Sequence, residues 1–137
     1  MVTWKKLIYF LPSALYCALI FFLSSGPINI NLKFFYWDKG WHWLEFSVLG
    51  FLLAFGYFKL LDKRPPLSMY LTFMTGALIG VSDETHQLFV PGRNCDWKDW
   101  LADLSGIVVG LIVYLLLKNK LTKFWSEKDV QTSATKT

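Results

Sequence analysis

Four apolar blocks run through the chain, each close in length to one crossing of a lipid bilayer, and this pattern constrains the fold most. Within the 137 residues the blocks are Leu7–Ser25, Trp41–Phe58, Leu67–Ser82 and Leu101–Leu117. A helical crossing takes about 20 apolar residues, and the last three blocks are each completed by a polar end. The blocks lack the alternation of a strand and the broad polar face of a soluble helix. The sequence therefore predicts an all-α fold, a four-helix transmembrane bundle.

The basic residues are distributed unevenly between the two ends of this predicted bundle. Ten of the fourteen lysines and arginines lie at the N-terminus, in the loop between the second and third blocks, or in the tail. An excess of Lys and Arg marks the cytoplasmic side, so we expect both termini to be cytoplasmic. Seven of the ten acidic residues lie at the opposite end, which divides the net charge of +4 into +7 inside and −3 outside. The basic composition therefore requires no nucleic-acid partner.

The two ends of the chain allow further predictions. Lys5 and Lys6 before an apolar block are compatible with a secretory signal, but the block is longer than a usual signal core. We therefore expect an uncleaved first helix. The sequence divides into a transmembrane domain over residues 1–120 and a polar, Lys-rich tail over residues 121–137, which we expect to be disordered in the cytoplasm.

Small and acidic residues form one stripe along each of the last two blocks. The stripe on the third block comprises Gly76, Gly80, Asp83 and Gln87, and that on the fourth comprises Asp99, Asp103, Gly106 and Gly110. Glycine ridges let two helices approach closely. If the two ridges face each other, the acidic ends of both stripes converge in one outer-face polar pocket.

The start of the second block carries ionisable residues on one helical face. Asp38, His42 and Glu45 follow helical spacing. Asp38 either caps the helix start or acts chemically. His42 and Glu45 form either a structural pair or a site in which His42 is a base, an acid or a ligand.

These patterns define two sets of candidate site residues. The catalytic candidates are His42, Asp83, Glu84 and Asp99, and the binding candidates are Asp38, Lys39, Glu45, Gln87, Arg93 and Asp103. Arg93 is the cation best suited to carboxylates or a substrate phosphate. No cofactor is predicted and no metal ligand is assigned. A divalent metal held by acids of this set with His42 or His86 stays an alternative, as does a purely structural polar network.

The dispersed polar residues resemble those of a known family. Asp38-Lys39 followed by His42, Asp83-Glu84 with Gln87, Pro91-Gly92-Arg93, Asp99 and Gly106 look like the VanZ-like family of integral membrane proteins. The resemblance implies a VanZ-like transmembrane domain over residues 1–120 in the bacterial inner (cytoplasmic) membrane. The family's named member is associated with lowered susceptibility to glycopeptide antibiotics, teicoplanin in particular.

Two functions from different classes follow as expectations. The first is a membrane protein that binds or acts on a cell-envelope component, such as a lipid-linked envelope precursor or a glycopeptide, and so modulates antibiotic susceptibility. The second is an enzyme at the membrane edge, a general acid/base or metal-assisted hydrolase or transferase acting on a lipid-linked precursor. The sequence leaves enzymatic activity and oligomeric state open.

Overall fold

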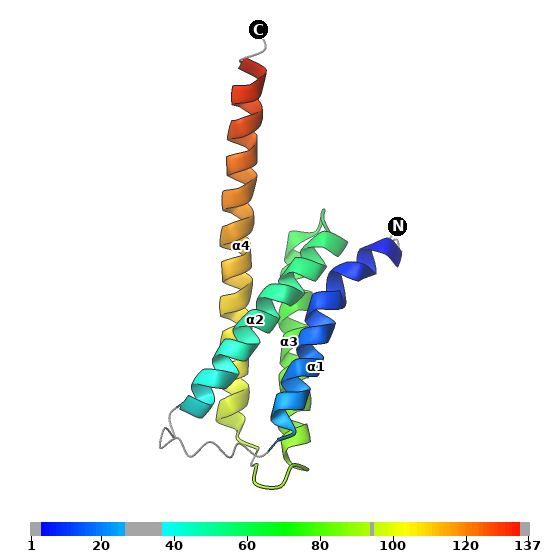
Figure 1. The fold of residues 1–137 in the computed structure, drawn as a ribbon, viewed down its shortest axis with the longest axis vertical. Coiled ribbons are helices and arrows are strands. Elements are labelled where there is room, and N and C mark those ends of the chain that lie inside the picture. Colours follow the sequence, from blue (N-terminus) through cyan, green and yellow to red (C-terminus); the bar gives the residue numbers. More distant parts are fainter. Residues whose placement is uncertain (1–3, 27–36, 94, 135–137) are drawn as a thin grey trace.

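The described part of the chain consists of helices joined by short turns and loops, with no strand among the described residues (Figure 1). A computed structural model describes residues 4–26, 37–93 and 95–134, with the side chains of residues 6–26, 39–93 and 95–120. A short 3-10 helix, η1 (Trp4–Phe10), leads into α1 (Leu11–Ser24), and the remaining helices are α2 (Trp37–Leu60), α3 (Pro65–Gln87) and α4 (Trp97–Ala134). The predicted all-α fold with four long helices is confirmed.

Proline and polar residues set the helix boundaries. Pro12 lies in the first turn of α1 and Pro65 and Pro66 open α3, at positions where the missing N–H of proline is not needed. Helix α2 begins at Trp37, before its apolar block, and α3 continues beyond its block to Gln87. The two extensions carry Asp38 and Lys39 on α2 and Asp83, Glu84 and Gln87 on α3, so these five candidate residues lie on helices.

Helix α4 is the longest element and runs past the rest of the bundle (Figure 1). Its backbone continues as a helix through residues 121–134, the stretch in which the sequence predicts a polar tail. The division of the chain at residue 120 stays a prediction.

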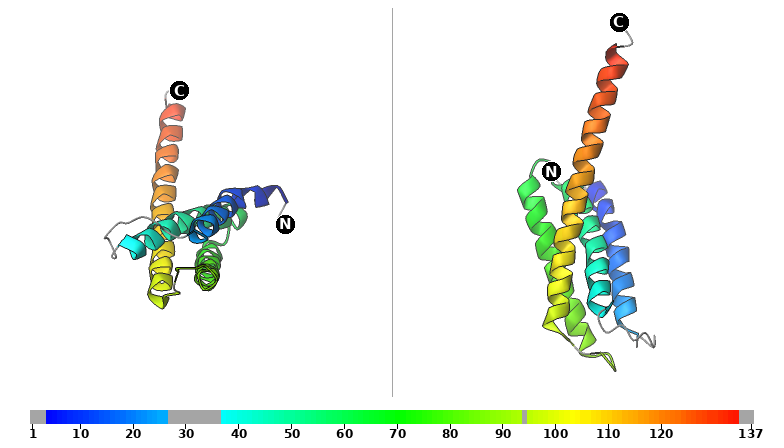
Figure 2. Two further views of the ribbon diagram at one scale, coloured as in Figure 1. Left: turned by 60° about the horizontal axis from the view of Figure 1, so that its bottom comes forward. Right: turned by 90° about the vertical axis from the view of Figure 1, so that its left-hand side faces the viewer.

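The helices alternate in direction, so the chain returns to the same end after every second helix (Figures 1 and 2). Helix η1 and the far end of α4 lie at one end of the bundle. The ends of α1 and α3 and the starts of α2 and α4 lie at the other end. The candidate site residues therefore gather at the end opposite to the described start and finish of the chain.

Helices α2 and α4 form the most extensive contact, and glycines allow it. A Cβ on Gly106 would lie 2.5 Å from the Trp43 carbonyl oxygen, and one on Gly110 would overlap the Ser47 carbonyl oxygen. The glycine stripe of α4 therefore faces α2. The condition that the two glycine ridges face each other is therefore not met, although α3 and α4 do touch.

Helix α3 does approach α4 through its glycines, but it meets side chains there. A Cβ on Gly76 would overlap the side chain of Ile107, and one on Gly80 would lie 3.2 Å from Asp103 Oδ2. Glycine spacing identified the contacting face of each helix. It did not identify the partner, because α4 presents different faces to α2 and to α3.

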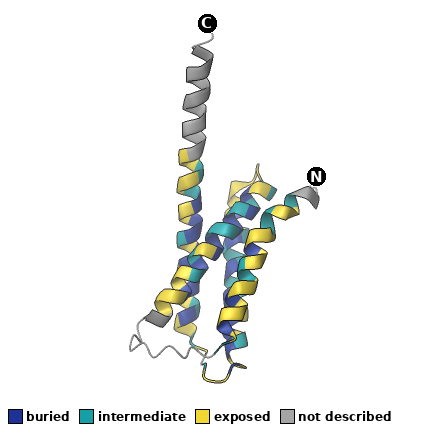
Figure 3. Ribbon diagram, in the orientation of Figure 1, coloured by how far each residue is buried: buried dark blue, intermediate teal, exposed yellow. Residues whose placement is uncertain are grey.

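The distribution of apolar side chains suits a bilayer. Three helical stretches, Lys6–Ser24, Lys39–Leu60 and Trp97–Lys120, are long and apolar enough to cross a membrane. Large apolar side chains are exposed on the outside of the bundle, including Phe22, Leu78 and Leu116 (Figure 3). In lipid such exposure carries no penalty.

Helix α3 has an inverted burial pattern. Its buried residues are all polar or glycine, and they are Ser68, Thr72, Gly76, Gly80, Asp83, Glu84 and Gln87. These polar residues lower its mean hydropathy, so α3 is not among the three stretches above. Its 23 residues still span about 35 Å, and it returns the chain between α2 and α4. Polar groups on the inner face and apolar groups on the outer face are typical of a helix that lies in lipid.

Candidate functional site

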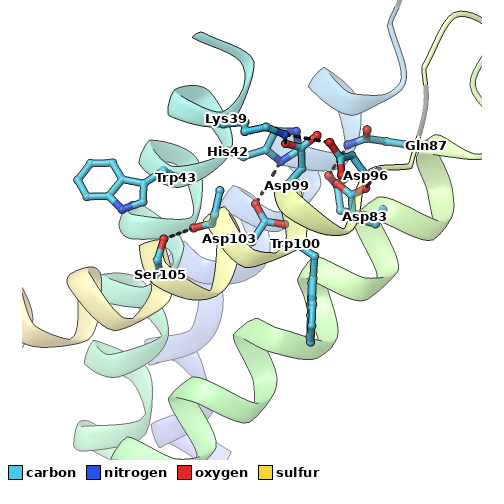
Figure 4. Close-up of polar contacts among 12 residues, drawn as sticks. Lys39, His42, Trp43, Asp83, Gln87, Asp96, Asp99, Trp100, Asp103 and Ser105 are labelled. Carbon is cyan, nitrogen blue, oxygen red and sulfur yellow. Dashed lines mark hydrogen bonds and ion pairs between the residues drawn. The ribbon is translucent and has the colours of Figure 1, made fainter. Parts of the chain in front are cut away.

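Polar side chains from α2, α3 and α4, most of them ionisable, meet at the end of the bundle where the α3–α4 loop lies (Figure 4). We call this set, comprising Lys39, His42, Asp83, Glu84, Gln87, Asp96, Asp99 and Asp103, the polar cluster. Within it, His42, Asp83, Glu84, Gln87, Asp99 and Asp103 are buried. Burying so many ionisable groups beside apolar helices is costly, and such groups mark functional sites in membrane proteins.

The first contact of the polar cluster joins α2 to α4. His42 Nδ1 lies 3.1 Å from Asp103 Oδ1, and the two residues are 5% and 1% exposed. The absence of a side chain at Gly80 leaves room for the other oxygen of Asp103 against α3. Asp103 thus fixes the orientation of the His42 ring through Nδ1. The other ring nitrogen, Nε2, is not used in this contact.

The second contact joins the same two helices nearer the end of the bundle. Lys39 Nζ contacts Asp99 Oδ1 and lies 3.1 Å from Asp96 Oδ2. Asp99 is buried, whereas the side chains of Lys39 and Asp96 are 45% and 39% exposed. The ammonium group therefore sits at the boundary between the buried acids and solvent.

Helix α3 contributes two carboxylates in succession. Asp83 Oδ2 accepts a hydrogen bond from Gln87 Nε2 at 3.0 Å, one turn later on the same helix. Glu84 Oε2 accepts one from the backbone N–H of Asp96 at 3.0 Å, which ties α3 to the start of α4. The Glu84 carboxylate also faces His42 and Asp99, since one ligand atom from each of the three residues lies within 4.8 Å of the others.

Several buried polar atoms of this region have no hydrogen-bond partner among the described residues. They are Asp83 Oδ1, Glu84 Oε1, Arg93 Nε and Asp103 Oδ2. An unsatisfied buried polar atom costs about 1–3 kcal/mol, so such atoms are usually satisfied by water, an ion or a ligand. The polar cluster is therefore incomplete with the described protein groups alone.

Three predicted site residues fall outside these contacts. Glu45 is half-buried on α2, one turn beyond His42, and does not belong to the three-residue group around Glu84. Arg93 is half-buried in the α3–α4 loop at the same end of the bundle. The backbone of Asp38 lies in α2, but its side chain lies outside the described part, so its role stays a prediction.

His86 faces away from the polar cluster. Its ring stacks on Phe21 of α1 with 4.1 Å between ring centroids, and its Nε2 lies 2.9 Å from Ser25 Oγ. These contacts give His86 a structural role between α1 and α3. The histidine in the group of ligand atoms around Glu84 is His42 and not His86.

Asp96 is a site residue that the sequence reasoning missed. Its Oδ1 accepts the backbone N–H of Lys98 at 3.0 Å, so it caps the start of α4. That hydrogen bond, aided by Lys39, lowers the pKa of the Asp96 carboxyl below its ordinary value. The signal was present in the spacing Asp96-Trp97-Lys98-Asp99, an acid at the cap position followed by another acid three residues later.

A comparison with known protein families assigns this chain to a family. The family profile described as VanZ/LLP1 matches residues 3–118, most of the chain and all of the polar cluster. The chain belongs to the VanZ/LLP1 family. No curated protein and no solved structure matches it. The VanZ-like resemblance of its dispersed polar residues is thus confirmed, and the chain is a VanZ-like membrane protein.

The arrangement suggests two kinds of chemistry. Buried carboxylates with unused oxygens can bind a cation or a hydrogen-bond donor. A histidine held by a carboxylate can act as a base or a ligand. Family membership by itself assigns neither a metal nor a cofactor.

Proposed function

We propose that this VanZ-like protein crosses the bacterial cytoplasmic membrane several times, with both termini in the cytoplasm and the polar cluster at the outer face. The support is the charge distribution: the loop between α2 and α3, at the opposite end from the cluster, carries Lys63 and Arg64.

At that face, the polar cluster binds or acts on a cell-envelope component with an ionic head group, such as a lipid-linked precursor, and thereby modulates susceptibility to glycopeptides including teicoplanin. The observation that carries this proposal is the convergence of buried ionisable groups from α2, α3 and α4 at one end of an apolar bundle. Packing alone does not require such groups, and placing them next to lipid is costly.

Lys39 and Arg93 are the cations at this end that would contact an anionic head group. Lys39 lies at the boundary between the buried acids and solvent. Arg93 lies in the α3–α4 loop, and its buried Nε is without a hydrogen-bond partner among the described residues. A phosphate oxygen fits this donor, because guanidinium groups bind phosphate through two parallel hydrogen bonds.

The test compares the lipids that co-purify with the full chain and with two arginine variants. The chain has only two arginines, Arg93 at the proposed site and Arg64 at the other end of the bundle. Mass spectrometry of extracted lipids should show a phosphate-bearing envelope lipid with wild type and Arg64→Ala, strongly depleted in Arg93→Ala. Equal amounts in all three proteins would contradict the proposed ligand. Teicoplanin susceptibility of cells expressing the same variants should follow the same order.

A second candidate function is favoured by the His42–Asp103 pair. A histidine held 3.1 Å from a buried carboxylate has the orientation of a general base. In this function the protein is a hydrolase or transferase that acts on the lipid-linked precursor. Turnover of the co-purified lipid by wild type and its loss in Asp103→Asn, with lipid binding retained, would favour the enzyme over the binding protein.

A further inference from the structure

Three buried side chains from three different helices place ligand atoms around one point. A ring nitrogen of His42, a carboxylate oxygen of Glu84 and a carboxylate oxygen of Asp99 all lie within 4.8 Å of one another. Metal–ligand bonds are about 2.0–2.6 Å long, so three atoms at this spacing can share one ion. Acidic groups often lie this close together without an ion, so proximity alone does not identify a metal site.

The bonding of Glu84 supplies the first of these observations. Glu84 is 4% exposed, and its carboxylate faces His42 and Asp99. One oxygen, Oε2, accepts the Asp96 N–H, whereas Oε1 is buried without a hydrogen-bond partner among the described residues. A carboxylate oxygen in such surroundings is strongly destabilised unless a proton or a cation satisfies it.

The environment of His42 supplies the second observation. Asp103 engages Nδ1 of the ring, which leaves Nε2 for another partner. Metal-binding histidines almost always use one ring nitrogen for the ion and the other for a carboxylate or carbonyl. His42 has the carboxylate part of this arrangement, with Asp103, buried at 1% exposure, as the supporting group.

The charges around the point also favour a cation. Glu84, Asp99 and Asp103 bring three carboxylates together, and among these three Lys39 contacts Asp99, through Oδ1. The second Asp99 oxygen is left for another ligand. A divalent ion would offset the repulsion between these acids, which one lysine at the boundary with solvent does only in part.

We propose that His42, Glu84 and Asp99 bind a divalent transition-metal ion, with Asp103 as the residue that positions His42. One imidazole nitrogen with two carboxylate oxygens suits Zn²⁺ or Mn²⁺, whereas Mg²⁺ and Ca²⁺ prefer oxygen ligands alone. Three protein ligands leave a coordination position for water or for an oxygen of a ligand. The metal site is independent of which envelope component the protein binds, and it is tested with metal ions alone.

The decisive experiment uses the full wild-type chain in detergent, stripped of metal and titrated with Co²⁺ as a spectroscopic substitute for Zn²⁺. We expect a single saturable site, visible absorption bands of a nitrogen-and-oxygen site, and a higher thermal unfolding midpoint. Zn²⁺ should displace Co²⁺, Mn²⁺ should compete only in large excess because it binds nitrogen and oxygen ligands more weakly than Co²⁺, and Mg²⁺ should not displace it. Folded wild type that shows no saturable Co²⁺ binding would overturn the site, and displacement by Mg²⁺ but not by Zn²⁺ or Mn²⁺ would overturn the class of metal.

Single variants test the assigned roles. Glu84→Gln should abolish saturable binding, and Asp103→Asn should weaken it by about 10–100-fold, as supporting residues of metal ligands do. His86→Gln, which alters the histidine that stacks on Phe21, is the matched control and should bind as wild type does. Unchanged affinity in folded Glu84→Gln would contradict the proposal.

Lys39→Gln provides a test of opposite sign. Removing the ammonium group from Asp99 should tighten Co²⁺ binding, since the cation no longer competes for that carboxylate. A purely structural role of Lys39 would leave the affinity per folded molecule unchanged. Weaker or unchanged binding in folded Lys39→Gln would count against Asp99 as a ligand.

Discussion

Asp96 shows how one half-buried residue connects helix geometry to the buried acids. Its side chain caps α4 through the Lys98 N–H, and its own N–H donates to Glu84. Its second oxygen contacts Lys39 on α2. The start of α4 is therefore held relative to both α2 and α3, which places Asp99 and Asp103 in the polar cluster.

Two substitutions at this position should separate capping from charge. Asp96→Ala removes the cap and the contact with Lys39, so we expect a lower thermal unfolding midpoint in detergent. Asp96→Asn keeps a good capping side chain and should lie between Asp96→Ala and wild type. Equal midpoints for Asp96→Ala and wild type would contradict the capping role.

The stabilisation that Asp96 gives the folded protein should weaken at low pH. Because the Lys98 hydrogen bond and Lys39 lower the pKa of Asp96 in the folded state, its stabilisation is fully present above the unfolded pKa of about 4. It is lost as pH falls through the folded pKa. The difference in midpoint between wild type and Asp96→Ala should therefore narrow on acidification below about pH 4. A constant difference would exclude the ionised carboxylate as its source.

At the scale of elements, the close contact of α2 and α4 decides how the bundle is built. Gly106 and Gly110 lie against the Trp43 and Ser47 carbonyls, and from α2 Gly50 lies so close to α4 that a Cβ there would be 2.6 Å from the Ile107 carbonyl oxygen. Backbone meets backbone along this line, and side chains pack on either side of it. The relative position of His42 and Asp103 depends on this approach.

Gly110→Ala should therefore be strongly destabilising, by about 1–3 kcal/mol or more, because the added methyl overlaps the Ser47 carbonyl oxygen and backbone cannot give way as a side chain can. Gly40→Ala is the matched control. It lies in the first turns of α2 with nothing within 4 Å of the added Cβ, so it should be neutral or slightly stabilising. Denaturant titration in detergent measures both, and equal effects would contradict the α2–α4 contact.

The sequence predicted the elements better than their pairing. Apolar block length predicted the four helices, and the helical spacing of Asp99 with Asp103 predicted that both face the bundle interior. The sequence did not predict that Gly106 and Gly110 would face α2. Spacing identifies which residues share a helix face, but not which helix packs against that face. Asp103 thus pairs with His42 of α2, and the approach of Glu84 to His42 depends on the packing of three helices.

Helical spacing could not predict the contacts of His86 or the capping role of Asp96. His86 and His42 are both histidines at the same end of the predicted bundle, but His86 faces Phe21 and Ser25 of α1. The direction of a side chain near a helix end depends on which neighbour packs against it. Asp96 was missed because capping depends on where the helix starts, which a sequence locates only within a few residues.

At the scale of the whole molecule, the proposed orientation places the α3–α4 loop outside the cell. Cys95 lies in this loop and is exposed, whereas Cys17 is half-buried in α1. The chain therefore carries a natural label site at the polar-cluster end. Partial desolvation and the neighbouring Glu84 carboxylate raise the pKa of the Cys95 thiol, so labelling calls for mildly alkaline buffer.

A membrane-impermeant maleimide should label Cys95 in intact cells. Cys95→Ser should abolish this labelling, which controls for Cys17. In the Cys95→Ser background, Lys63→Cys should be labelled only after the membrane is permeabilised, because it lies in the turn between α2 and α3 at the other end. Labelling of position 63 but not of Cys95 in intact cells would reverse the orientation.

The central claim is that α2, α3 and α4 converge on His42, and nuclear magnetic resonance of isotopically labelled histidine tests it most directly. The chain has two histidines, so His86→Gln assigns both imidazole signals. The His42 signals should shift in each of Glu84→Gln, Asp99→Asn and Asp103→Asn, while the His86 signals stay in place and respond instead to Ser25→Ala. His42 signals that are unchanged by Glu84→Gln and Asp99→Asn in folded protein would contradict the account.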